Sequence, residues 1–230
     1  MPINVYYGFD PREEYGAHVF CSSLIHRSSW PVSLIPLHAD LFTSFWDRKQ
    51  SLDETNAFTR TRFLIPFLQD FKGWAIFCDG ADMLCRADIG ELWALRDEYK
   101  AVQVVAHDYK TTALRKYIGT EMEAENRDYP RKNQSSVMLI NCKHFAWRQM
   151  TPENVSRLTG AELHQFAFIA EDRIGYLPKE WNHLVGEEPK NPDAKIAHFT
   201  LGGPWWPAYR ECEFADEWAA AALKATHITP

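Results

Sequence analysis

Two aspartates at the end of an apolar run are the residues of this sequence best suited to chemistry. Residues 74–78 are apolar and lead directly into Asp79-Gly-Ala-Asp82. Such a run has the length and composition of a buried strand, and Gly80 allows the backbone to bend after it. Two hard carboxylate oxygens at a strand end suit Mg²⁺ or Mn²⁺. A tight turn would use the same residue types for its own geometry, so both interpretations stand for this stretch alone.

The elements that precede these aspartates predict how they are held. Residues 3–7 and 32–37 are apolar runs typical of strands, and residues 13–25 repeat apolar side chains at helical spacing. A strand, a helix and a strand in this order predict a parallel pair in an α/β fold. The turn after the first strand of such a sheet commonly faces a ligand. Gly8 and Asp10 are therefore candidates for holding a nucleotide, although a plain helix entry explains them nearly as well.

A second helix is predicted over residues 57–71, and it carries two arginines toward the aspartates. Pro66 is expected to kink or divide this helix. Arg60 or Arg62 could clamp a diphosphate if it pointed at the site, and for one of the two a solvated helix face is the better interpretation. Further strands are predicted at residues 101–106, 134–141 and 174–177.

A late stretch combines a histidine with a glycine loop. His198 ends a short apolar run and is followed by Gly202 and Gly203. A loop of this kind can bring backbone N–H groups close to phosphates. A lone histidine is more often a satisfied core residue than a ligand, but the neighbouring glycines favour a ligand role here.

The segment 109–133 is rich in charged residues and lacks apolar periodicity. No helix or long strand is predicted from it. Long irregular segments in a compact domain are often functional, so we expect a lid or a recognition loop.

Length, composition and charge narrow the class of protein. The 230 residues are 46% hydrophobic with a net charge of −6, so we expect one globular domain over residues 1–230. No Lys/Arg run indicates a nucleic-acid-binding surface. The five cysteines include no CxxC pair, which fits a cytoplasmic protein without a disulfide framework or zinc knuckle. We expect neither a signal peptide nor a transmembrane segment.

Taken in order, these pieces resemble the family 8 glycosyltransferases, which have the GT-A fold. The resemblance extends over nearly the whole chain, and the order of the short motifs is more specific than any one of them. It implies a mixed, mostly parallel α/β sheet flanked by helices. It also implies a retaining hexosyltransferase that uses a nucleotide sugar such as UDP-glucose or UDP-galactose. The motifs that carry it lie at residues 5–10, 57–66, 77–84, 136–141 and 198–205.

The resemblance also implies roles for individual residues. Asp79, Asp82 and His198 would hold Mn²⁺ or Mg²⁺, which stabilises the charge that develops on the leaving diphosphate. The expected catalytic set is Asp79 and Asp82 together with Gln134, His164 and Gln165, the last three facing the donor sugar or the acceptor. The expected nucleotide- and diphosphate-binding set is Tyr7, Gly8, Asp10, Arg62, Gly202, Gly203 and Trp205.

Three departures from the family pattern are visible. The acidic motif is Asp-x-x-Asp, one residue longer than the DxD of the family. Residues 134–136 read Gln-Ser-Ser where the family often has Asn-Ala-Gly. The late motif at residues 198–205 lacks the family's Lys, so Arg62 or Lys195 is expected to supply the missing positive charge.

Two other functions are compatible with the sequence. A nucleotidyltransferase or a sugar-nucleotide hydrolase would share the metal and the nucleotide, whereas a catalytically silent domain would bind a sugar nucleotide without turnover. The expected partners of a transferase are a nucleotide-sugar donor and a glycan or another hydroxyl-bearing acceptor. A nucleic-acid acceptor is not indicated, although the sequence does not exclude one.

Overall fold

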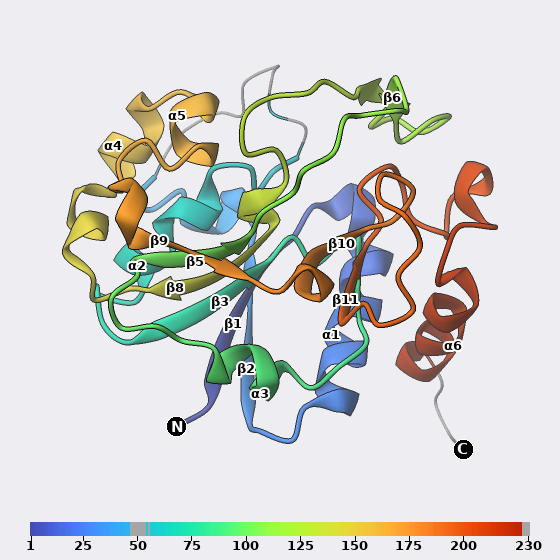
Figure 1. Cartoon of the computed structure of the whole chain (residues 1–230), viewed down its shortest axis with the longest axis horizontal. Helices are drawn as coiled ribbons and strands as arrows, with labels where there is room; N and C mark the ends of the chain where they lie inside the picture. Colours follow the sequence, from blue (N-terminus) through green and yellow to red (C-terminus); the bar gives the residue numbers. More distant parts are fainter. Residues whose placement is uncertain (47–53, 55, 227–230) are drawn as a thin grey trace.

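A six-stranded sheet forms the centre of the molecule (Figure 1). The computed structural model describes residues 1–46, 54 and 56–226. The strand order is β2-β1-β3-β8-β5-β9, and every strand except β8 runs in the same direction. The expected mixed, mostly parallel α/β sheet is therefore confirmed. Its strands are β1 (Ile3–Gly8), β2 (Val32–Leu37), β3 (Trp74–Cys78), β5 (Val102–Val105), β8 (Val137–Asn141) and β9 (Ile174–Leu177).

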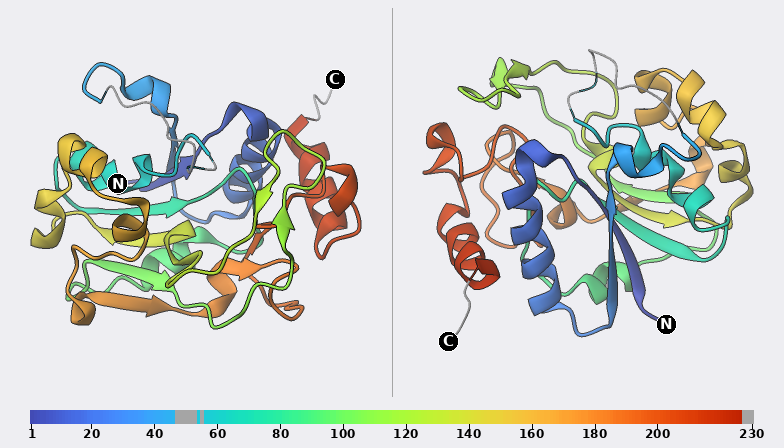
Figure 2. Two further views of the ribbon diagram at one scale, coloured as in Figure 1. Left: turned by 90° about the horizontal axis from the view of Figure 1, so that it is seen from above. Right: turned by 180° about the vertical axis from the view of Figure 1, so that it is seen from behind.

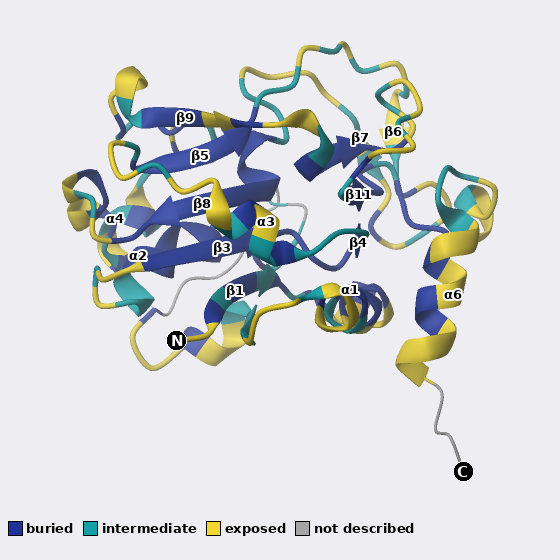
Figure 3. Cartoon of the chain, turned by 60° about the horizontal axis from the view of Figure 1, so that its bottom comes forward, coloured by how far each residue is buried: buried dark blue, intermediate teal, exposed yellow. Residues whose placement is uncertain are grey.

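Alternation along the central strand separates two hydrophobic cores. In β3, Trp74, Ile76 and Cys78 join the core that contains Phe20 of the first helix. Ala75 and Phe77 face the opposite core, as expected because successive side chains of a strand point to opposite faces. The strand is buried on both faces (Figure 3), which explains its continuous apolar run.

Helices cover both faces of this sheet. Long helices α1 (Glu14–Arg27) and α6 (Ala215–Thr226) lie side by side (Figure 2). None of the helices in the described ranges is long and apolar enough to cross a membrane. The shorter helices are α2 (Ile65–Leu68), α3 (Ile89–Ala94), α4 (Pro152–Arg157) and α5 (Gly160–His164).

A second, three-stranded sheet joins distant parts of the chain. Its order is β10-β11-β4, formed by β10 (His183–Leu184), β11 (Ile196–His198) and β4 (Met83–Cys85). The antiparallel register of β11 and β4 places His198 opposite Met83. This small sheet therefore brings His198 to the turn that contains the two aspartates.

The helix predicted over residues 57–71, with a kink or division at Pro66, is wrong in its extent. The chain forms a 3₁₀ turn at Thr61–Leu64 and then the short α2, which has Pro66 in its first turn. Proline is tolerated there because the first N–H groups of a helix have no intrahelical partner. Asp70 and Phe71 then take positive φ values of 52° and 53°, so the helix does not continue. Arg62 and its neighbours in the turn are buried, unlike the exposed face of a surface helix.

Candidate metal centre

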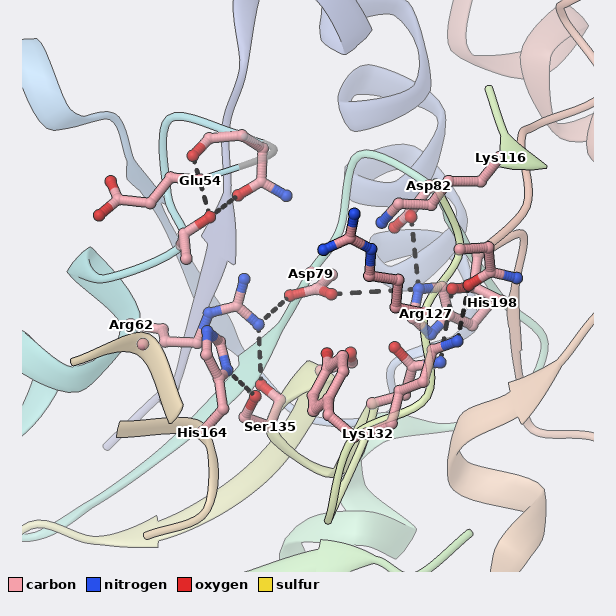
Figure 4. A pocket seen from close by; sticks show the side chains of 18 of the residues that line it. Glu54, Arg62, Asp79, Asp82, Lys116, Arg127, Lys132, Ser135, His164 and His198 are labelled. Carbon is pink, nitrogen blue, oxygen red and sulfur yellow. Dashed lines mark hydrogen bonds and ion pairs between the residues drawn. The ribbon is translucent and has the colours of Figure 1, made fainter. Parts of the chain in front are cut away.

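Asp79, Asp82 and His198 converge at the carboxyl end of β3 (Figure 4). One ligand atom from each residue lies within 4.8 Å of the other two. The Nε2 atom of His198 is 3.3 Å from Asp82 Oδ2 and 4.0 Å from Asp79 Oδ2. Gly80 has a φ of 76°, a left-handed conformation that glycine adopts without strain. This bend allows both carboxylates of the lengthened Asp-x-x-Asp motif to face one place.

Burial makes the charges of this cluster interdependent. Burial raises the pKa of Asp79 above its usual value, and the opposing charge of Arg62 only partly offsets it. Burial also acts on Asp82, but the charge and hydrogen bond of His198, together with the charge of Lys116, outweigh burial and lower the pKa of that carboxyl. Conversely, burial lowers the pKa of His198, while Asp82 and Asp79 outweigh burial and raise it. The two carboxylates therefore require positive charge beside them.

The donor set fits a hard divalent cation. Asp82 Oδ1 is buried and has no hydrogen-bond partner among the described residues, and an unpaired buried oxygen is costly unless something binds it. Two carboxylates and one imidazole suit Mn²⁺ or Mg²⁺ with further positions left for other ligands. Asp79, Asp82 and His198 are thus the residues that would hold such an ion.

Asn182 orients the imidazole of His198. The Nδ1 atom of His198 lies 2.9 Å from Asn182 Oδ1, and Asn182 is fully buried. An amide oxygen accepts hydrogen bonds, so Nδ1 carries the proton and Nε2 is directed at the aspartates. The amide nitrogen of Asn182 lies 3.0 Å from both the carbonyl oxygen of Asn133 and Nε2 of His107. Outer hydrogen bonds of this kind commonly orient metal-binding histidines.

Arg62 is directed at Asp79. Its Nη1 atom lies 2.5 Å from Asp79 Oδ1 and 3.0 Å from the carbonyl oxygen of Ser135. Its guanidinium also lies 5.3 Å and 4.8 Å from the ring centroids of Phe58 and Phe77. Arg62 lines the cavity beside the aspartates, and it serves first as the partner that compensates the buried carboxylate of Asp79.

A cavity of about 380 Å³ opens from the aspartates, a size suited to a small-molecule ligand. His164 and Gln165 line it, whereas Gln134 is buried beside it and does not. The Nδ1 atom of His164 lies 2.7 Å from Ser135 Oγ. Burial, together with the positive charges of Arg62 and Arg60, lowers the pKa of His164 to about 3. This imidazole is therefore neutral at physiological pH.

The expected nucleotide contacts after β1 do not line the cavity. The ring of Phe58 covers Gly8 so closely that a side chain at Gly8 would overlap it. Asp10 Oδ1 accepts hydrogen bonds from the backbone and side chain of Arg12, and its Oδ2 accepts from Arg12 and from the backbone of Ala57. Tyr7 packs near Phe20 in the core. Asp10 thus ties the turn to residue 57 in this structure.

The glycine loop after His198 is likewise used for aromatic packing. Gly202 lies against the ring of Tyr209, and Gly203 lies against the ring of Trp205. Trp205 itself packs on Trp218 of α6, with ring centroids 5.1 Å apart. These residues do not line the cavity.

The segment 109–133 contributes residues to the lining of the cavity. It contains the hairpin of β6 (Arg115–Lys116) and β7 (Ala124–Glu125), which lies above the carboxyl ends of the parallel strands (Figures 1 and 2). Sequence reasoning gave no role to Lys116 in this segment or to Asn182, because neither lies in a periodic run or a recognisable motif. The residues of the segment that line the cavity are Lys116, Tyr117, Glu125, Asn126, Arg127, Tyr129, Lys132 and Asn133.

Several solved glycosyltransferases share this fold. The bifunctional glycosyltransferase WbbM superposes with a TM-score of 0.68 and 16% identity, over 96% of this chain and 49% of WbbM, so the chain spans about half of that protein. The galactosyltransferase LgtC, solved with donor and acceptor sugar analogues, gives a TM-score of 0.58 and 13% identity over 99% of this chain and 98% of LgtC. The fold is therefore the GT-A glycosyltransferase fold, which confirms the expectation from the sequence.

Sequence comparison then places the chain in a particular family. It is 40% identical over 225 residues to Protein CDI of Arabidopsis thaliana, covering 94% of this chain and 85% of Protein CDI. The chain belongs to the same family as Protein CDI. No family model matches the sequence.

Proposed function

We propose that the protein is a metal-dependent hexosyltransferase that moves a sugar from a nucleotide sugar to an acceptor hydroxyl with retention of configuration. The observation that carries this proposal is the convergence of Asp79, Asp82 and His198 on a ligand-sized cavity. The LgtC structure, which shares the fold, holds donor and acceptor sugar analogues. By analogy, the donor here is a UDP-linked hexose such as UDP-glucose or UDP-galactose.

The described residues suit a transfer that relies on charge stabilisation. A bound dication would supply positive charge for the leaving diphosphate without proton transfer. Asp79, Asp82 and His198 would hold that charge at one end of the cavity, and Arg62 pairs with Asp79 and orients its carboxylate. Residues of the segment 109–133 line the cavity, and their displacement of water around a bound donor would strengthen electrostatic interactions there. His164 and Gln165 line the cavity wall and are placed to face a sugar or an acceptor.

The carboxylates of the cavity outside the metal group are engaged with arginines. Glu54 Oε1 lies 2.5 Å from Arg60 Nε, and Glu125 forms an ion pair with Arg127. A carboxylate whose oxygen is engaged by a guanidinium is poorly placed to accept a proton from an acceptor hydroxyl. This arrangement favours attack of the acceptor from the leaving-group side, where the departing phosphate takes the proton.

The test is a titration of the purified protein with a panel of nucleotide sugars, with and without Mn²⁺. Heat of binding and release of free nucleoside diphosphate are followed together, with and without candidate glycan acceptors. Mn²⁺-dependent binding of one UDP-sugar and release of UDP with sugar transfer would support the proposal. Binding without turnover on any acceptor would favour a silent domain, and release of pyrophosphate would favour a nucleotidyltransferase. Failure to bind any nucleotide sugar with Mn²⁺ present would overturn the proposal.

A further inference from the structure

Lys116 is a cation of the cavity whose side chain is held by no described residue. Within the described ranges this side chain makes no hydrogen bond or ion pair, and its Nζ lies 5.0 Å from the ring centroid of Tyr117. The other cations that line the cavity are held: Arg60 by Glu54, Arg62 by Asp79, Arg127 by Glu125, and Lys132 by Thr111 and Asn126.

Three buried carboxylates act on this ammonium group through their charge. Burial lowers the pKa of Lys116, and the charges of Asp82, Asp79 and Glu13 act in the opposite direction. Glu13 is 2% exposed, and its Oε1 has no hydrogen-bond partner among the described residues. Figure 4 shows Lys116 extending from its strand toward Asp82. Before a dication binds, Lys116 and His198 are thus the positive charges that face the aspartates together with Arg62.

The backbone of Lys116 is anchored while its side chain is not. The backbone N–H of Tyr117 donates to the carbonyl oxygen of Leu201 at 2.7 Å, and that of Ile118 donates to the hydroxyl of Tyr209 at 2.9 Å. These contacts fix the hairpin to the loop that follows His198. A lysine side chain is a point charge on a flexible four-carbon stem. Its ammonium group can therefore move between the aspartates and the adjoining cavity without movement of the hairpin.

The positive charge expected from Lys195 is not available at this site. Lys195 Nζ lies 2.6 Å from Glu91 and 5.0 Å from the ring centroid of Trp181, and Lys195 does not line the cavity. A dication held by two aspartates is neutralised by them, and Arg62 adds only one positive charge, so the two negative charges of a donor's diphosphate would not be fully balanced. A buried anion without a counter-charge is strongly unfavourable.

We propose that Lys116 is an exchangeable counter-ion, which together with Arg62 balances the charge of Asp79 and Asp82 until a dication displaces it and then binds the donor's diphosphate. This inference rests on the proposed function for its second step. It predicts that removal of the charge raises the affinity for Mn²⁺ and lowers the affinity for UDP, because Lys116 competes with the metal but assists binding of the nucleotide. A residue that merely stabilised the hairpin would weaken both binding events.

The experiment compares Lys116→Met with Lys195→Met, which removes the same charge outside the cavity. Calorimetry measures binding of Mn²⁺ alone, and then of UDP and UMP in the presence of saturating Mn²⁺. We expect Lys116→Met to bind Mn²⁺ several-fold more tightly than wild type. We expect it to bind UDP about ten-fold or more weakly, the effect of losing a hydrogen bond to a charged group, with a smaller change for UMP. Lys195→Met should match wild type in all three titrations.

Two results would overturn this inference. One is Mn²⁺ affinity in Lys116→Met that is unchanged or weaker than wild type. The other is UDP affinity in Lys116→Met equal to that of wild type. Failure of the proposed function is distinguishable, because wild type itself would then bind Mn²⁺ but no UDP. Circular dichroism and the midpoint of thermal unfolding establish that each variant is folded.

Discussion

The amide oxygen of Asn182 receives the Nδ1 proton of His198 across 2.9 Å, and this contact decides which imidazole nitrogen faces the aspartates. Asn182 is held in turn by the carbonyl oxygen of Asn133 and by His107. His107 Nδ1 lies 3.1 Å from Glu188 Oε1. A buried chain of polar groups therefore connects the candidate metal centre to the segment after β10.

Replacement of Asn182 by Ala should weaken Mn²⁺ binding about 10- to 100-fold, the usual effect of losing an outer hydrogen bond to a metal ligand. Asn182→Asp keeps an acceptor for the Nδ1 proton of His198, so it should lose less affinity. Isothermal titration with Mn²⁺ checks both variants. Equal affinity in Asn182→Ala and wild type, with the fold intact, would show that the amide does not orient His198.

Replacement of Asp82 by Ala should abolish Mn²⁺-dependent turnover of the donor while leaving the fold intact. The dication is expected to supply several kcal/mol of charge stabilisation, so UDP release should fall by about 100-fold or more. Folding should survive because the substitution removes one of two adjacent buried carboxylates, whose repulsion raises the pKa of Asp79. Near-wild-type UDP release from Asp82→Ala would contradict the metal role.

Replacement of His198 by Ala should weaken Mn²⁺ binding without removing it, because Asp79 and Asp82 remain as hard ligands. The comparison is made by titration with Mn²⁺ at neutral pH. An unchanged affinity would identify His198 as a core residue whose contact with Asp82 is structural.

Replacement of Arg62 by Met should destabilise the metal-free protein by about 3 kcal/mol, because it leaves the buried carboxylate of Asp79 without its partner. The ion pair is buried on both sides. Mn²⁺ should restore part of this loss, so it should raise the unfolding midpoint more in Arg62→Met than in wild type. Urea unfolding with and without Mn²⁺ measures this difference. Equal stabilisation by Mn²⁺ in the two proteins would show that Arg62 does not compensate the charge of the metal centre.

Replacement of His164 by Gln should reduce the loss of stability on acidification. The pKa of His164 is about 3 in the folded protein and about 6.5 in an unfolded chain. Between these values the unfolded state binds the proton and the folded state does not, so stability falls as pH decreases through this window, by at most about 1.4 kcal/mol per pH unit. Urea unfolding at pH 6.5 and 4.5 should show a smaller difference in His164→Gln. The control is His26→Gln on the exposed side of α1, which should behave as wild type; an identical acid dependence in His164→Gln would contradict the prediction.

The sequence by itself determined the strand that carries the aspartates. The apolar run at residues 74–78 predicts β3 to the residue, because a strand buried on both faces needs apolar side chains at every position. The same local reasoning found the opening strand, helix and strand, and it identified Asp79, Asp82 and His198 as candidates before any contact between them was known. Their order along the chain also indicated the GT-A fold.

Tertiary structure alone decided which candidates share a cavity. Gly8 and Gly203 have the residue type that lets a ligand approach, yet the rings of Phe58 and Trp205 occupy that space. No motif or periodicity in the sequence marks Lys116 or Asn182 as a site residue. They reach the site through tertiary contacts, which are the pairing of β11 with β4 and the anchoring of the hairpin on the loop after His198. Periodicity and motif spacing report on neighbours in sequence, whereas these contacts join residues separated by many tens of positions.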